Sequence, residues 1–401
     1  EDSDAAQDWP TFRANAERGS FVDSDVPADF RTLWTKEFGA RIGPVSIAGK
    51  RVYVPLVDQH RVVALDAETG DEAWSGFADA RVDTPPTIYK GLVLFGSADG
   101  RATCLDAESG RLVWRRRLAP DVELIGAENQ LESRWPVHGA VLVQNGKLYA
   151  VAGRSSYIDH GLFCYQLDPA TGELSGTRHI RSGTIPDFST KSIPGTLADM
   201  LVGTGGCVWM RRTGLFGNGG GHKRRIVATG GFRDDTWFNR TTWTAGPVDH
   251  AQLLVMDREY VYGLESFRGI NRARAFKPGH KGYRIFAKAF AQSGGNADGQ
   301  KRRGKGAPDV WSRHIPLRGT AMAVGRSHLF VAGAPDVVDS EDPLAAFEGR
   351  KGTRLLVLDK QTGEQLAEYT LPSLPVWDGM ALARGSLYMA LQNGNLVKMG
   401  E

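Results

Sequence analysis

A short turn motif recurs four times along this chain, each time after an apolar run that ends in Leu-Asp. The motif is Asp, two residues, Thr or Ser, and Gly, and its copies span residues 64–70, 104–110, 166–172 and 357–363. Asp suits such a turn because its carboxylate accepts backbone N–H groups two residues on, and Gly suits its left-handed last position. In two copies a tryptophan, Trp74 or Trp114, follows four residues after the glycine. Strand–turn–strand units repeated at roughly forty residues or more predict a β-propeller.

We therefore expect an all-β fold, a seven-bladed β-propeller of four-stranded antiparallel blades, with eight blades as the alternative. Residues 33–38 resemble an outer strand that no unit precedes, while the last unit, 377–401, ends after its third strand. The N-terminal strand is expected to pair with the C-terminal blade, with Trp34 beside Leu396, because this pairing removes an open sheet edge. The expected domains are an N-terminal extension, 1–30, and a single β-propeller, 31–401.

The composition agrees with many short strands joined by tight turns. Of the 401 residues 41% are hydrophobic, and there are 49 Gly and 19 Pro. No apolar run approaches the roughly 18 residues that a membrane-spanning helix needs. The three cysteines, Cys104, Cys164 and Cys207, lie far apart without Cys-x-x-Cys or Cys/His spacing, so we expect buried thiols and no metal site.

The charge is unevenly distributed. The formal net charge is only +3, yet residues 211–318 hold 21 Lys and Arg against 8 Asp and Glu. The remaining chain holds 28 basic and 38 acidic residues. This asymmetry indicates an anionic partner for one sector. Solvated loops with scattered charge would give the same pattern, and both interpretations stay open.

The repeated phrase resembles the pyrroloquinoline-quinone-like (quinoprotein-type) β-propeller repeat. That repeat is shared by quinone-dependent alcohol dehydrogenases and by the propeller lipoprotein of the outer-membrane β-barrel assembly machinery. Four further stretches resemble exported, mostly uncharacterised bacterial propeller proteins: 8–13, 81–87, 130–139 and 231–237. The resemblance implies an extracytoplasmic protein, periplasmic or secreted, either mature or part of a longer polypeptide. Family dehydrogenases carry two adjacent cysteines under the cofactor; this chain has no such pair, so we expect no cofactor and consider PQQ unlikely.

The binding face is expected where the connections are long. In a four-stranded blade the tight hairpins open on one face, and the longer connections, such as 120–136 and 336–353, open on the other. Arg and Trp there suit anionic, planar or saccharide ligands. His138 and Tyr157 are the candidate base or acid. The candidate ligand-binding residues are Arg134, Trp135, His138, Arg154, Arg233, Asp234, Asp235, Trp237, Arg240, Trp243, Glu265, Arg268, Trp377 and Asp378. These side chains could equally tie long loops to the rim.

The leading hypothesis is a non-redox exported propeller that binds a partner protein or an anionic ligand on its long-loop face. The first alternative is a polysaccharide lyase or hydrolase acting on a uronate or sulfated glycan, in which an Arg neutralises the carboxylate. A quinone-dependent dehydrogenase and a scaffold within a longer polypeptide are further alternatives. Motifs of hydrolases, zinc proteases and P-loop enzymes are absent from the sequence, which favours a non-catalytic protein. Basic patches such as 301–305 lack interleaved aromatics, so no nucleic acid is expected, and we expect a monomer.

Overall fold

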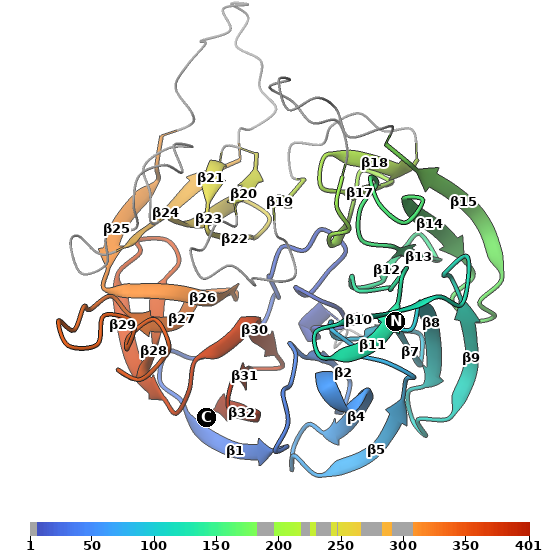
Figure 1. Cartoon of the computed structure of the whole chain (residues 1–401). Coiled ribbons are helices and arrows are strands. Elements are labelled where there is room, and N and C mark those ends of the chain that lie inside the picture. The colour runs from blue at the N-terminus through green and yellow to red at the C-terminus, as the bar shows by residue number, and fades with distance from the viewer. Residues whose placement is uncertain are drawn as a thin grey trace, which may run out of the picture.

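The repeated turn motif closes the outer hairpins of a ring-like arrangement of antiparallel sheets (Figure 1). In a computed structural model of the protein, the described residues are 6–182, 196–217, 225–229, 242–246, 248–265, 283–290 and 308–401. Within them the regular structure is almost entirely β-strand, with short 3-10 turns at residues 6–7 and at η2 (Val57–Gln59), which lies between β3 and β4. The all-β class of four-stranded antiparallel sheets is thus confirmed. In these residues no helix has the length and apolar character that a membrane crossing needs.

Six sheets of the described residues have four strands each. Three come from the first half of the chain: β2 (Ser46–Ala48), β3 (Arg51–Leu56), β4 (Arg61–Asp66) and β5 (Glu72–Phe77); β6 (Thr87–Tyr89), β7 (Leu92–Ser97), β8 (Arg101–Asp106) and β9 (Leu112–Arg117); β12 (Leu142–Gln144), β13 (Lys147–Ala152), β14 (Leu162–Leu167) and β15 (Leu174–Ile180). Two are β22 (Leu253–Met256), β23 (Tyr260–Glu265), β24 (Tyr283–Ala289) and β25 (Trp311–Ile315); β26 (Leu317–Val324), β27 (His328–Pro335), β28 (Thr353–Asp359) and β29 (Gln365–Leu371). The last combines β30 (Pro375–Ala383), β31 (Ser386–Leu391) and β32 (Asn395–Gly400) with β1 (Arg31–Glu37).

Smaller sheets complete the described part. Two have three strands: β16 (Leu201–Thr204), β17 (Cys207–Met210) and β18 (Thr213–Phe216); β19 (Val227–Thr229), β20 (Thr242–Ala245) and β21 (Val248–Ala251). A two-stranded hairpin, β10 (Leu124–Ala127) and β11 (Gln130–Ser133), lies between β9 and β12. Strand β1 pairs antiparallel with β32, but the expected register is wrong by two residues: Trp34 lies opposite Lys398, and Lys36 lies opposite Leu396.

The turn motif has the same geometry in its four copies. The carboxylate of Asp66 accepts the backbone N–H of Glu68 at 2.9 Å and of Thr69 at 3.2 Å, and Asp359 accepts from Gln361 and Thr362 at 2.9 and 2.8 Å. These hydrogen bonds to backbone N–H groups favour the charged form and lower the Asp66 pKa. The closing glycines are left-handed, with φ between 70° and 77°. The sequence therefore encodes these turns locally.

Each of these turns receives a tryptophan from the outer strand of a neighbouring sheet. The indole of Trp74 donates to Ala107 O at 3.0 Å and lies so close to Gly110 that a Cβ there would be 2.6 Å from the ring. The same arrangement joins Trp34 to Gly70, Trp114 to Gly172 and Trp311 to Gly363. We call each a Trp–turn contact. The tryptophans thus serve the next turn along the ring, including the turns at 172 and 363, whose own following strands lack one.

The N-terminal segment lies inside the ring rather than outside it (Figure 1). Residues 7–25, here called the N-terminal belt, form backbone hydrogen bonds with one innermost strand after another. For example, Ile47 N donates to Trp9 O at 2.8 Å and Met256 N donates to Gly19 O at 2.8 Å. The other innermost strand residues bonded in this way are Ile88, Gly203, Val324 and, just past the strand ends, Arg326 and Arg384. Trp9, Val22 and Val26 are buried in a core cluster together with β2–β4 and β30–β32, so these side chains are part of the core.

Candidate functional site

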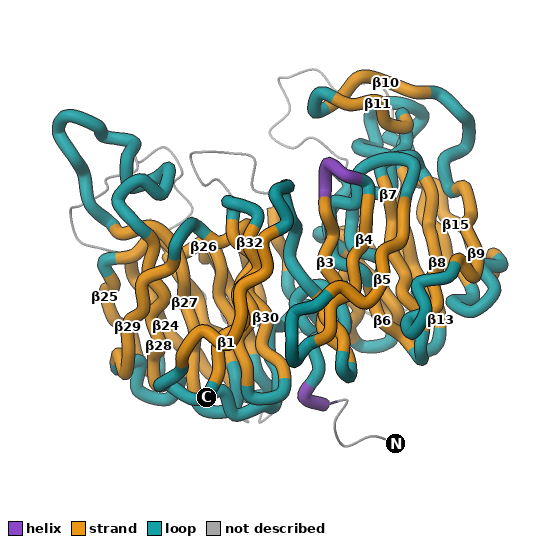
Figure 2. Tube along the Cα trace, turned by 90° about the horizontal axis from the view of Figure 1, so that it is seen from below, coloured by secondary structure: helices purple, strands orange, loops and turns teal. Residues whose placement is uncertain are grey.

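The hairpin of β10 and β11 stands above the other sheets on the long-loop face (Figure 2). Its pairing places Leu124 opposite Ser133 and Leu131 opposite Gly126, so the two leucines share one face of the hairpin. That face is open to solvent: Leu124 is 59% and Leu131 67% exposed, and Val122, just before β10, is 68% exposed. Three large apolar side chains therefore lie together on a projecting element.

The other face of the hairpin is held by a buried charge network of Arg81, Asp83, Glu132, His138 and Arg154. Glu132, on β11, forms an ion pair with Arg81 Nη2 at 2.9 Å and accepts a hydrogen bond from Arg154. Arg81 Nε donates to Asp83 at 3.0 Å, and His138 Nδ1 lies 3.0 Å from the same carboxylate. Arg81 and Asp83 are placed by an extended run before β6 that contains Pro85 and Pro86, residues that favour extended backbone.

The electrostatics of this network are balanced. Two guanidinium groups face two carboxylates, and the Arg81, Asp83 and Glu132 side chains are at most 5% exposed. Burial lowers the pKa of Arg81, but the hydrogen bond and charge of Asp83 outweigh it, so the net shift is upward. Removing one partner of such a buried pair costs about 3–5 kcal/mol, because it leaves an uncompensated charge. The network therefore fixes the hairpin on the propeller.

The structure brings together four of the predicted residues around this hairpin. Arg154 and His138 are members of the network, and Trp135 is buried in the core below it. Arg134 lies over the Trp135 ring at 5.8 Å and pairs with Glu123 at 2.5 Å. The two predicted arginines at this hairpin, Arg134 and Arg154, are thus bonded to carboxylates of the chain itself.

Tyr157, the second candidate acid or base, is partly buried after β13, where its backbone N–H donates to Ser155 Oγ at 3.2 Å. The sequence missed Arg81, Asp83 and Glu132 as site residues. The only sequence signal for them was that they lie in the stretches that carried the family resemblance. The catalytic or binding roles of the predicted site residues near the hairpin stay predictions.

Trp243 and Asp378 lie elsewhere, on the axis, and both contact the N-terminal belt. The guanidinium of Arg13 stacks on the Trp243 ring at 4.2 Å and donates to Asp378 at 2.5 Å. Glu265 pairs with Arg284 at 2.6 Å, and Trp377 packs against the core around β26. The remaining predicted residues, Arg233, Asp234, Asp235, Trp237, Arg240 and Arg268, lie outside the described residues.

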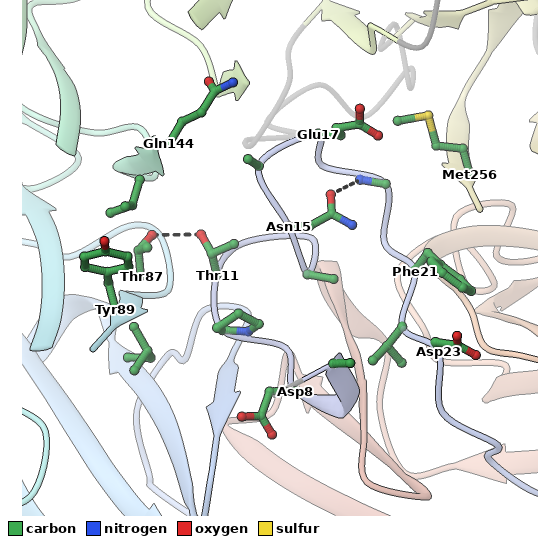
Figure 3. A pocket seen from close by; sticks show the side chains of 18 of the residues that line it. Asp8, Thr11, Asn15, Glu17, Phe21, Asp23, Thr87, Tyr89, Gln144 and Met256 are labelled. Carbon is green, nitrogen blue, oxygen red and sulfur yellow. Dashed lines mark hydrogen bonds between the residues drawn. The ribbon is translucent and has the colours of Figure 1, made fainter. Parts of the chain in front are cut away.

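A pocket of about 670 Å³ lies along the axis and is lined by turn residues of the short-turn face, opposite the β10–β11 hairpin (Figure 3). The belt forms one wall, in which Thr11 bonds to Thr87 of β6 at 2.8 Å and Asn15 accepts from Gly19 N at 3.1 Å. Tyr89 and Asn145, from the tight hairpins of β6 and β12, form the opposite wall. The sequence did not predict a cavity on this face, because its loops are short.

The described residues contain no group of three or more His, Cys, Asp and Glu side chains arranged to hold a metal ion. All three cysteines are buried and form no disulfide, and burial raises the pKa of Cys104 and of Cys164 to about 12. The thiols of Cys104 and Cys164 are therefore protonated at neutral pH and unreactive as nucleophiles.

The proteins to which this chain is similar in sequence agree with the propeller repeat that the turn motif predicts. Residues 23–183 match the family described as "Outer membrane protein assembly factor BamB". A protein of that name from Alteromonas naphthalenivorans is 26% identical over 46% of this chain and 44% of its own length. The dehydrogenase subunit of a quinone alcohol dehydrogenase from Gluconobacter oxydans is 28% identical over 40% of this chain and only 22% of its own length.

Among solved structures, quinohemoprotein alcohol dehydrogenase from Comamonas testosteroni covers 99% of this chain at a TM-score of 0.51 and 13% identity, with 81% of that structure covered. At this identity the likeness concerns the fold alone. The matched parts span less than half the length of the two curated relatives. Taken with the four turn motifs and their Trp–turn contacts, these matches show that the chain is similar to the PQQ-like, BamB-like propeller family, whose match covers residues 23–183.

Proposed function

We propose that this protein is a non-redox propeller that binds a partner protein outside the cytoplasm, through the apolar face of the β10–β11 hairpin. The observation that carries this proposal is the pairing of two features in one element. One face of the hairpin presents Val122, Leu124 and Leu131 to solvent, and the other is fixed by buried ion pairs. An exposed apolar patch on a rigid projection is typical of a protein-interaction site.

Charge supports a protein partner over an anionic polysaccharide at this site. Arg134 and Arg154 are paired with Glu123 and Glu132, so a uronate or sulfate would have to displace an existing carboxylate. A relative over 46% of the chain is named an outer membrane protein assembly factor, which supports both a protein partner and an extracytoplasmic location. The glycan-cleaving enzyme stays the alternative.

We also infer that the sheets form one closed ring. Support comes from the pairing of β1 with β32 and from Trp34 of β1, which reaches Gly70 of the first sheet. Between β15 and β22 the described residues hold two separate sheets, β16–β18 and β19–β21. This arrangement favours eight blades over seven.

The test replaces Leu124 or Leu131 with a photo-crosslinking residue in the organism that makes the protein. Leu112 is the matched control, because it is 56% exposed but lies on the outer strand β9. We expect one discrete crosslinked protein from positions 124 and 131 and none from position 112. Leu131→Asp combined with the crosslinker at 124 should abolish the product. Equal products from all three positions, or none, would overturn the proposal.

A further inference from the structure

Among the described residues, Arg13 in the N-terminal belt is one of the most deeply buried charged side chains. Its Nη1 donates to Asp378 Oδ1 at 2.5 Å, its Nε donates to Arg18 O at 2.9 Å, and its Nη2 donates to Leu254 O. The indole of Trp243 covers one side of its plane. We call Trp243, Leu254, Asp378 and the Arg18 carbonyl the axial cage.

The cage matches a guanidinium in shape as well as in charge. Three oxygen atoms of the cage accept hydrogen bonds, one from each of the three guanidinium nitrogens. Trp243 supplies an aromatic ring face, on which guanidinium cations stack favourably. Arg13 is 1% exposed, and its acceptors come from the belt, β22 and β30. An ammonium group could satisfy the charge of Asp378 but not the three directions.

Strain indicates that the cage holds the belt in place. Arg13 and Asp378 are both left-handed, with φ of 58° and 53°, and the belt residues Ala14, Arg18 and Ser20 are left-handed as well. For a residue other than Gly this conformation costs about 1–2 kcal/mol, so contacts must compensate it. Arg18, also fully buried, donates to Leu201 O at 2.8 Å and Val141 O at 3.3 Å, and so joins the sheets of β16 and β12.

Arg13 and Arg18 contact two sheets that have no Trp–turn contact among the described residues. The Trp–turn contacts of the described residues join the sheets of β1, β2, β6, β12, β22 and β26. No such contact is present among the described residues at the sheets of β16 and β20. Arg18 reaches the first of these through Leu201, and Arg13 reaches the second through Trp243.

We propose that the axial cage is a guanidinium-binding site and that the N-terminal belt, through Arg13, is its covalently tethered ligand. The class of ligand is the arginine side chain of an extended peptide, here supplied by the chain itself. Filling the cage joins the sheets that have no Trp–turn contact. An empty cage therefore loosens that part of the ring and accepts a small guanidinium from solution.

The experiment is chemical rescue of Arg13→Gly in the full chain. Glycine at this φ removes the backbone strain, so any loss of stability reports the missing guanidinium. We expect a lower midpoint of thermal unfolding and faster amide hydrogen exchange in β16, β20 and β22, with β3 and β7 unchanged. Millimolar methylguanidinium should restore at least half of the midpoint loss in a saturable manner, relative to wild type in the same solution, whereas methylammonium should not.

Arg326→Ala is the matched control, because Arg326 also donates to a carboxylate and a carbonyl, both of Asp23, but is exposed. It should lose little stability and show no rescue. If Arg13→Gly does not fold, Asp378→Asn keeps the guanidinium and weakens only the cage, and it should show the same local exchange. No saturable rescue, equal rescue by methylammonium, or exchange that rises uniformly over all sheets would overturn the proposal.

Discussion

The substitution Gly110→Ala should show how much a Trp–turn contact adds to the free energy of unfolding, apart from the contribution of the turn itself. The left-handed φ of Gly110 is 70°, and a Cβ there would lie 2.6 Å from the Trp74 ring, whereas ordinary contact begins at 3.4 Å. The ring must therefore move by roughly 1 Å, which breaks its 3.0 Å hydrogen bond to Ala107 O. Gly91 is the matched control: it lies in the same sheet at φ 77°, and its Cβ would meet nothing within 4 Å.

Gly91→Ala should cost only the backbone strain, about 1 kcal/mol. Gly110→Ala adds the lost hydrogen bond, about 0.5–1.5 kcal/mol, and the displaced indole packing, for a total of about 2–4 kcal/mol. Urea unfolding followed by circular dichroism measures both free energies of unfolding. In the Trp74→Ala background the difference between the two glycine variants should vanish. Equal losses from the two glycine variants in the wild-type background would refute the contact as a source of stability.

Three further perturbations test other parts of the molecule. Burial raises the Asp199 pKa from 3.8 to about 6, so between these pH values the folded state holds a proton that the unfolded state has released. The free energy of unfolding should therefore fall by about 2 kcal/mol from pH 4 to pH 6, and Asp199→Asn should flatten this slope in urea midpoints. Glu132→Gln leaves Arg81 and Arg154 short of a carboxylate and should speed amide exchange and proteolysis in β10–β11; an unchanged hairpin would contradict the anchoring role. Trp311→Phe should cost about 1 kcal/mol through the lost indole hydrogen bond, and Trp311→Ala distinctly more; equal losses would show that the ring packing contributes nothing.

The repeat was predictable from sequence because its information is local. The Asp and Gly of each turn act within a few residues, and alternating apolar runs define the strands around them. The sequence did not indicate that each tryptophan contacts the turn of the next sheet along the chain rather than the turn of its own sheet. Trp311 was missed because its own blade has lost the turn motif, while its partner, Gly363, lies some fifty residues further on.

The candidate site was predicted less well for a related reason. Arg134, Trp135, His138 and Arg154 do gather near one hairpin, since they flank neighbouring strands. Their carboxylate partners were not foreseen, because Glu132 and Asp83 become neighbours only after the ring forms. The belt was expected only as part of an N-terminal extension, and none of its arginines was predicted as a core or site residue. Only the assembled axis makes Arg13 and Arg18 core residues.

The path of the belt also constrains the order in which the molecule folds during synthesis. Its backbone bonds link residues 7–22 to Val324 and Arg384, which are synthesised about 300 residues later. Loop closure over such separations is slow, so the belt must wait for these partners before its backbone bonds can form. A nascent chain truncated before residue 375 would have neither the carboxylate that receives Arg13 nor the strand that receives β1.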